Sequence, residues 1–226
     1  MRPWIAIALG LAASLLAPAV SAQDEVPQEP AAPTGTPAPE QARDETPTWR
    51  WPGAIIWDLE LRLAIPPDTG FDRSLGAHGY GNLRIVPALV AGLAAPVGVE
   101  WLWIGGQVGV RGRTWDHPTR DSASLVGVDV LATVRARFLL GERVELGVTA
   151  GGGLGWIGTW VNGVMSDQLA PRFNVQLDLA FRVGDHVALG PSFGWDYFQS
   201  PSAVNAYGDG VEAGGPYFGL SVEGRE

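Results

Sequence analysis

The sequence lacks cysteine altogether, and it also lacks lysine. Without cysteine in its 226 residues, the fold cannot use disulfides and offers no cysteine for a lipid anchor. All fifteen basic residues are arginines, and the net charge of −9 leaves no basic patch, which excludes the electrostatic footprint of nucleic-acid binding. Beyond the N-terminus no run of eighteen apolar residues occurs, so no transmembrane helix is expected.

The first fifty residues have the composition of a targeting segment followed by a linker. Arg2 precedes a short apolar core over 4–16, and Val20-Ser21-Ala22 offers small residues for cleavage, so 1–22 is predicted to be a secretory signal peptide. Residues 23–50 are rich in proline and acidic side chains and have almost no large apolar residue. Such a segment cannot bury enough surface to order itself. We predict a disordered periplasmic linker, either a plain spacer or a peptide that grips a periplasmic partner.

The rest of the chain alternates between apolar and polar residues. In the stretch PRFNVQLDLAFRV, residues 171–183, every second side chain is apolar, and the others are mostly polar or charged. Successive side chains of a strand point to opposite faces, so this period of two predicts strands. The same pattern predicts eight strands over 55–65, 80–93, 99–111, 124–139, 144–159, 171–183, 186–198 and 212–224.

The connections between these segments alternate in length. Short turns are expected at 94–98, 140–143 and 184–185, and longer loops at 66–79, 112–123, 160–170 and 199–211. Short turns at one end and long loops at the other are typical of outer-membrane barrels. We therefore predict an all-β fold, an eight-stranded antiparallel up-and-down transmembrane β-barrel, with both termini in the periplasm.

The charged side chains are expected to fill the interior of this barrel. Thirteen residues at roughly 3.3 Å each, tilted by about 40°, are long enough to cross the apolar band of a membrane. A one-residue slip of a strand would turn its arginines into lipid, at a cost of about 2–4 kcal/mol each near the midplane. The predicted internal network of ion pairs, in which Glu60 pairs with Arg84, contains Asp58, Glu60, Arg62, Arg84, Glu100, Arg111, Asp129, Arg135, Arg137, Glu145, Arg172, Asp178, Arg182 and Asp196.

Large aromatic residues fall near both ends of the predicted strands. Rings with a polar edge favour the headgroup level of a membrane, so aromatic side chains on the apolar face predict two girdles. Trp101 and Trp103 occupy strand positions of the polar face, so their side chains are expected to point inward. There they would fill the interior and leave no room for a wide pore. The predicted girdles consist of Trp57, Phe138 and Phe181 at the periplasmic end and Trp156, Phe173, Trp195 and Tyr197 at the outer end.

Over residues 51–226 the chain resembles the small eight-stranded outer-membrane barrels of the OmpA-like and OmpX-like kind. The resemblance rests on the strand pattern and implies the outer membrane of a Gram-negative type of bacterium, with membrane lipid around the barrel. The expected function is a non-enzymatic platform that presents four external loops, 66–79, 112–123, 160–170 and 199–211, for adhesion or recognition. No catalytic, cofactor-binding or metal-binding residue is assigned, and no nucleic-acid partner is expected.

Two other functions fit parts of the pattern. A soluble periplasmic barrel of the lipocalin type would place the apolar side chains inside, around an apolar ligand. A lipid-modifying outer-membrane enzyme would need a histidine and a serine, with an acid, and the candidates are His78 and His117 with loop serines such as Ser74, Ser122 or Ser124.

Overall fold

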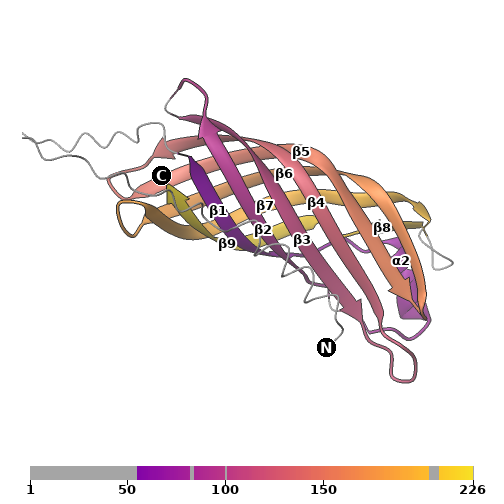
Figure 1. The fold of residues 1–226 in the computed structure, drawn as a ribbon. Coiled ribbons are helices and arrows are strands. Elements are labelled where there is room, and N and C mark those ends of the chain that lie inside the picture. Colours follow the sequence, from indigo (N-terminus) through magenta and orange to yellow (C-terminus); the bar gives the residue numbers. More distant parts are fainter. Residues whose placement is uncertain (1–54, 82–83, 100, 204–208, 226) are drawn as a thin grey trace, which may run out of the picture. The chain divides into compact units, whose positions relative to one another are not determined.

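The computed structural model describes residues 55–81, 84–99, 101–203 and 209–225. The signal peptide and linker predicted for 1–22 and 23–50 lie outside these residues. Among the described residues, no helix has the length and hydropathy needed to cross a bilayer. The elements shown in Figure 1 are β1 (Ile56–Ala64), α2 (Gly70–Ala77), β2 (Val86–Pro96), β3 (Leu102–Trp115), β4 (Ala123–Leu139), β5 (Val144–Val161), β6 (Val164–Arg182), β7 (Val187–Ala203), β8 (Asp209–Glu212) and β9 (Gly215–Arg225).

The strands form one closed antiparallel barrel. Consecutive strands from β1 to β7 pair with one another, and β9 lies between β7 and β1 and closes the wall. The short β8 continues the register of β9 along β7, because Gln199 pairs with Glu212 and Asp196 pairs with Gly215. β8 and β9 are therefore two stretches of the eighth barrel strand, and the prediction of an eight-stranded up-and-down barrel is confirmed.

The strands are tilted, so lines of paired residues climb around the wall. One such line runs from Trp57 at the start of β1 through Leu93, Gly106, Ala132, Gly152 and Phe173 to Tyr197 on β7. Six steps of about 4.8 Å at a tilt of about 40° raise this line by roughly 18 Å. The line therefore joins the end of the short turns to the end of the long loops.

The apolar side chains point outward and the charged side chains point inward. Leu154 and Val175 on the outer face are 63% and 60% exposed, whereas Arg62 and Arg172 inside are fully buried. This is the inverse of a soluble ligand-binding barrel, so the lipocalin alternative is wrong. A surface of exposed Leu, Val, Ile and Phe around a charged interior is stable only in lipid.

The third long loop expected from the sequence does not exist. β5 and β6 continue through 160–170 as a hairpin, and their pairing extends to Val161 and Val164. The two residues between them, Asn162 and Gly163, have φ angles of 50° and 80°. Positive φ at both central positions is the type I′ turn that asparagine and glycine favour. The Asn-Gly pair was thus a hairpin signal in the sequence, and the loop prediction was wrong.

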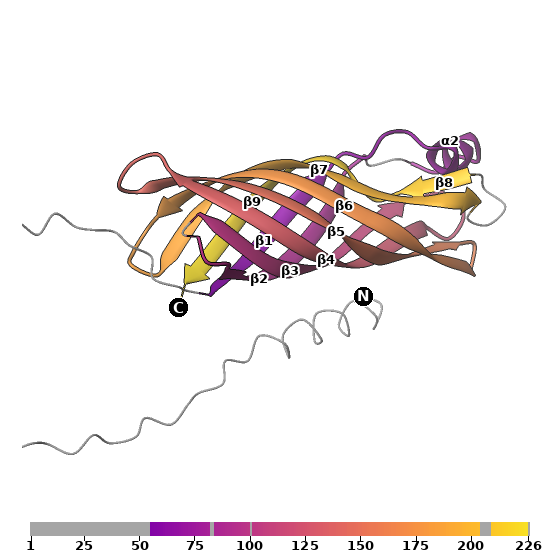
Figure 2. The ribbon, with the colours of Figure 1, turned by 90° about the horizontal axis from the view of Figure 1, so that it is seen from above.

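The other outer connections are shorter or more structured than expected. The predicted loop 66–79 contains α2, whose N-cap Thr69 accepts a hydrogen bond from the backbone N–H of Asp72 at 3.2 Å. The strand predicted from Tyr80 begins only at Val86, and Tyr80 is buried beneath the outer end of the barrel. The loop between β3 and β4 spans only 116–122, because both strands are longer than predicted. Figure 2 shows α2 beside β8 at this end.

Candidate functional site

Six charged side chains form a closed cluster in the middle of the barrel, here called the middle cluster. Its shared centre is Asp196 on β7, which meets Arg172 at 2.7 Å, Arg111 at 3.1 Å and Arg62 at 3.6 Å. Arg62 also pairs with Glu60 at 2.7 Å, and Arg111 and Arg172 share Asp129 on β4 at 3.0 and 3.4 Å. The side chains are fully desolvated, and three arginines balance three carboxylates. The middle cluster consists of Glu60, Arg62, Arg111, Asp129, Arg172 and Asp196.

A second cluster, here called the lower cluster, lies toward the end of the short turns. Glu145 on β5 accepts contacts from three arginines, with the Nε of Arg182 at 2.7 Å. Arg135 pairs with Asp58 at 2.7 Å, so charges from opposite walls meet across the lumen. Four arginines and four carboxylates again balance. The lower cluster consists of Asp58, Arg135, Arg137, Glu145, Asp178, Arg182, Glu223 and Arg225.

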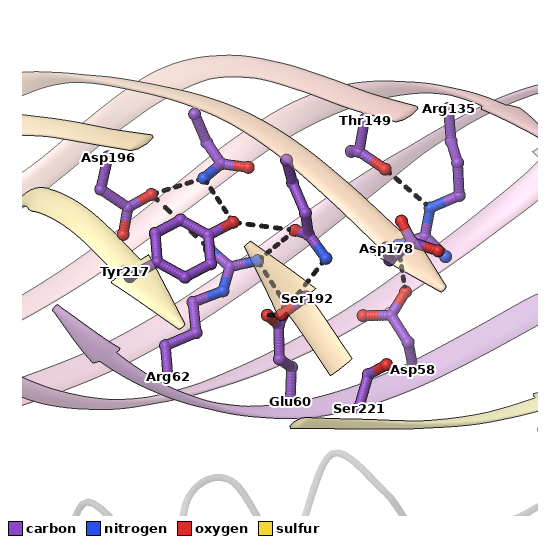
Figure 3. Close-up of polar contacts among 12 residues, drawn as sticks. Asp58, Glu60, Arg62, Arg135, Thr149, Asp178, Ser192, Asp196, Tyr217 and Ser221 are labelled. Atoms are coloured by element: carbon purple, nitrogen blue, oxygen red, sulfur yellow. Dashed lines mark hydrogen bonds and ion pairs between the residues drawn. The ribbon is translucent and has the colours of Figure 1, made fainter. Parts of the chain in front are cut away.

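Neutral polar side chains complete the middle cluster, as Figure 3 shows. Gln176 accepts from Arg62 at 2.8 Å and from the Tyr217 hydroxyl at 3.1 Å. Asn174 donates to Asp196 at 2.5 Å, and Ser192 donates to Glu60. Sequence reasoning missed these partners, although each has the inward parity of its strand. Buried carboxylates need such donors, because water is excluded from them.

Glycines on neighbouring strands make room for the buried carboxylates. Gly92 lies directly across from Asp58, and a Cβ added at Gly92 would lie 2.7 Å from the Asp58 Oδ1. Gly109 faces Asp129 in the same way, with a distance of 2.9 Å. Large and small residues thus alternate across the ladder, as a narrow barrel requires.

Two residues predicted for the interior, Arg84 and Trp101, are exposed instead. Arg84 was predicted to lie in the internal network, and this prediction is wrong. Arg84 lies before β2 begins, is exposed, and pairs with Asp68 at 2.7 Å. The expected pair between Glu60 and Arg84 is therefore wrong, because the strand parity assumed for Arg84 does not apply outside the strand. The prediction that Trp101 points inward is also wrong. Trp101 lies in the turn before β3, is 49% exposed and stacks on Phe138. Glu100 lies outside the described residues.

A group of buried, mostly apolar side chains, here called the apolar cap, closes the barrel above the middle cluster. Phe198 marks the boundary, because the guanidinium groups of Arg111 and Arg172 lie 5.1 and 5.5 Å from the centre of its ring. α2 contributes Phe71 and Leu75 to this cap. The cap consists of Phe71, Leu75, Tyr80, Trp115, Ala123, Leu125, Ile157, Val161, Ala170, Phe198, Val211 and Ala213.

One charged group fastens α2 to the wall. Asp72 on α2 pairs with Arg113 at 2.9 Å and accepts from the indole N–H of Trp115 at 3.1 Å. Glu212 on β8 pairs with Gln199 on β7 and is buried beside this group. Burial, together with the nearby Asp72 carboxylate, raises the pKa of Glu212 above its ordinary value.

The predicted girdle residues fall at two levels of the outer wall. At the end of the short turns, Phe138 and Phe181 are exposed and Trp57 is half-buried. Toward the other end, Phe173 and Tyr197 are neighbours across β6 and β7 with ring centres 6.1 Å apart. Trp195 is exposed and Trp156 half-buried at this level.

The rings of His78 and His117 both contact backbone groups. His78 Nδ1 donates to the carbonyl oxygen of Ser74 at 2.7 Å, so that contact supplies no nucleophile. His117 Nδ1 accepts from the backbone N–H of Thr119 at 3.0 Å, and its Nε2 donates to the carbonyl of His78 at 3.1 Å. Among the residues that the structure describes, no group of three His, Cys, Asp or Glu side chains is placed to hold a metal ion.

Comparison with known proteins identifies the fold but no relative by sequence. No protein-family model matches the chain, and no curated protein matches it. Neisserial surface protein A has a similar structure, with a TM-score of 0.50 at 12% identity over 76% of this chain and 96% of that chain. Also similar are Ail of Yersinia pestis, crystallised with the heparin analogue sucrose octasulfate (TM-score 0.49, 13% identity, 77% and 99% covered), and the N-terminal barrel domain of Pseudomonas aeruginosa OprF (0.40, 13%, 77% and 99%).

The closed eight-stranded wall, the outward apolar side chains and the match to Neisserial surface protein A agree with one another. The chain has the fold of the small eight-stranded outer-membrane β-barrels.

Proposed function

We propose that the protein is a non-enzymatic outer-membrane barrel that serves as a platform and presents its external loops for adhesion or recognition. The observation that carries this proposal is the filled interior. The lower cluster, the middle cluster and the apolar cap are all buried inside the described barrel. An interior built of mutually neutralised groups supports neither a wide pore nor an exposed reactive group. The chemistry available to partners is then that of the outer end.

Contacts between described parts of three outer connections hold them together, which suits a recognition surface. The Tyr80 hydroxyl donates to Asn162 at 2.8 Å and thereby ties the segment after α2 to the β5–β6 turn. The His117 ring packs against Tyr80, with ring centres 4.9 Å apart, and the N–H of Gly81 donates to the carbonyl of Asp116 at 2.7 Å. Loops fixed in this way lose little entropy on binding a partner. An even number of strands puts both ends of the barrel chain on the same side of the membrane, and the short turns at that side support a periplasmic position.

Two experiments test this function. In planar lipid bilayers the purified protein should give no stable conductance steps, and a steady open channel would contradict the closed interior. In a bacterium that expresses the protein, replacing residues 117–121 by a Gly-Ser linker should reduce adhesion to host cells or matrix. The matched control replaces the turn 140–143 at the opposite end by the same kind of linker. Equal adhesion of the two variants would refute the role of the external loops.

A further inference from the structure

The top of the wall is polar on two strands and aromatic on the next. Thr114 on β3, Ser124 on β4, Trp160 on β5 and Met165 on β6 form one line of paired residues. All four belong to the outward-facing set. Along this line the wall is polar on β3 and β4, whereas on β5 and β6, further up the tilted ladder, it carries an indole and a thioether, and Met165 is 49% exposed.

The indole of Trp160 meets a second indole in a corner. Trp156 and Trp160 have ring centres 6.2 Å apart and planes inclined at 68°. Gly158 lies between them, and a Cβ there would come within 2.6 Å of Trp156 Cζ2 and 3.0 Å of Trp160 Cη2. Both rings therefore lie over the bare backbone of Gly158, which only glycine permits. The corner is a shaped surface on the outside of the projecting hairpin.

A carboxylate fixes the orientation of this corner. Asp167 lies directly across from Gly158 and accepts the indole N–H of Trp156 at 2.8 Å through Oδ2. Leu169, paired with Trp156, is 74% exposed and continues downward into the lipid-facing surface. The corner thus presents two aromatic faces and an acceptor oxygen directly above the apolar belt.

The corner lies at the height of lipid headgroups. Trp160 is four residues beyond Trp156 along β5, which corresponds to roughly 10 Å along the membrane normal at a strand tilt of about 40°. Since β6 is one step further up the tilted ladder, Met165 lies higher still. Hydrocarbon does not reach this level, but the sugar headgroups of outer-leaflet glycolipids do.

We propose that Trp156, Trp160 and Asp167 form a binding site for a sugar headgroup of an outer-leaflet glycolipid. The C–H groups on the apolar face of a pyranose ring suit the electron-rich face of an indole. The Asp167 carboxylate accepts hydrogen bonds from sugar hydroxyls, and Leu169 contacts the acyl region of the same lipid. This inference rests on the membrane-barrel fold and does not depend on the adhesive role of the loops.

Nanodiscs of defined composition test the proposal. The protein is placed in discs of phosphatidylcholine alone, with lipid A added, and with lipopolysaccharide that carries core sugars, and the midpoint of thermal unfolding is measured by gel mobility. We expect the core-sugar lipid to raise the midpoint beyond the effect of lipid A. In phosphatidylcholine discs, soluble core oligosaccharide should quench tryptophan fluorescence, and Trp160→Leu should weaken that binding by about tenfold.

Two further variants make the result decisive. Gly158→Val keeps both indoles but displaces them, and it should lose the oligosaccharide response as Trp160→Leu does. Trp101→Leu removes an exposed tryptophan at the other end of the barrel and should leave the response unchanged. Equal effects of lipid A and the core-sugar lipid would assign the contact to acyl chains or phosphates and overturn the sugar site. So would an unchanged response in both Trp160→Leu and Gly158→Val, while normal insertion of these variants would leave the platform function intact.

Discussion

Neutralising Asp196 should destabilise the barrel strongly. In Asp196→Asn the side chain keeps its size, and the amide still offers one acceptor oxygen. The change leaves Arg62, Arg111 and Arg172 facing only Glu60 and Asp129, so the middle cluster carries one uncompensated positive charge. None of the three arginines can reach water, because their side chains are fully buried.

The expected cost follows from the burial of that charge. Breaking a buried ion pair by removing one partner typically costs about 3–5 kcal/mol, since the other charge is left desolvated. The amide of Asn174, which donates to Asp196 at 2.5 Å, would also face a group that can present its own N–H. By contrast, Asp68→Asn breaks the exposed pair with Arg84 and should cost less than about 1 kcal/mol.

A second variant separates lost charge balance from lost contacts. Combining Asp196→Asn with Arg172→Met leaves two arginines and two carboxylates, so the double variant should be more stable than the sum of the single changes predicts. The coupling is expected to be about 1–3 kcal/mol. Urea unfolding in phospholipid vesicles, followed by tryptophan fluorescence and gel mobility, provides the free energies of unfolding.

Two outcomes would refute this reasoning. If Asp196→Asn costs no more than Asp68→Asn, the interior is hydrated and the charges in it are screened. If the costs of Asp196→Asn and Arg172→Met simply add, the middle cluster does not act as one neutral unit.

Three further changes test other parts of the structure by the same unfolding measurement or by proteolysis. Gly92→Ala should cost about 1–3 kcal/mol because its Cβ meets the Asp58 carboxylate, whereas the outward Gly152→Ala, with Phe173 at 3.5 Å, should be tolerated; equal costs would contradict the packing argument. Because the pKa of Glu212 is raised in the folded protein, its stabilising contribution is present below about pH 4.3 and is lost as pH rises through the folded pKa. Glu212→Gln removes this titration, so it should protect the cap from protease at pH 7 but not at pH 4. Gly163→Ala, at φ 80°, should destabilise the β5–β6 hairpin by about 1 kcal/mol or more, and no loss would argue against the type I′ turn.

The strand pattern predicted the wall because the side-chain period of a strand is fixed at two. Within β6, the alternating apolar side chains of residues 171–182 all point outward, and Arg172 and Asp178 point inward. The rule failed where the residues lie outside strands, as at Arg84 and Trp101. Parity has no meaning there, because a turn reorients the backbone between one strand and the next.

Specific partners inside the barrel could not be predicted from parity alone. The sequence indicates that Arg62 and Asp196 both point inward, but β1 and β7 are separated by β9 in the wall, and their pairing depends on closure of the barrel. The expected pair between Glu60 and Arg84 followed the nearest strands in sequence, whereas Glu60 pairs with Arg62 on its own strand. The apolar cap was not predicted for a similar reason. α2 is only eight residues long, and its apolar side chains contact residues that are distant in the sequence and come close only in the folded barrel.

The arrangement of charges implies that the internal ion pairs specify the register in which the barrel closes more than they add to its net stability. Asp196 on β7 is shared by arginines from β1, β3 and β6, and Arg137 on β4 reaches Glu223 on β9. The pair of Arg172 and Asp196 joins the neighbouring strands β6 and β7, but the other contacts join strands that are not neighbours, so they form only when the wall closes in the correct register. Desolvation offsets much of the attraction in such pairs. A barrel closed in another register, however, would separate Asp196 from Arg62 and Arg111, so the native closure is the arrangement in which Asp196 meets all three arginines of the middle cluster.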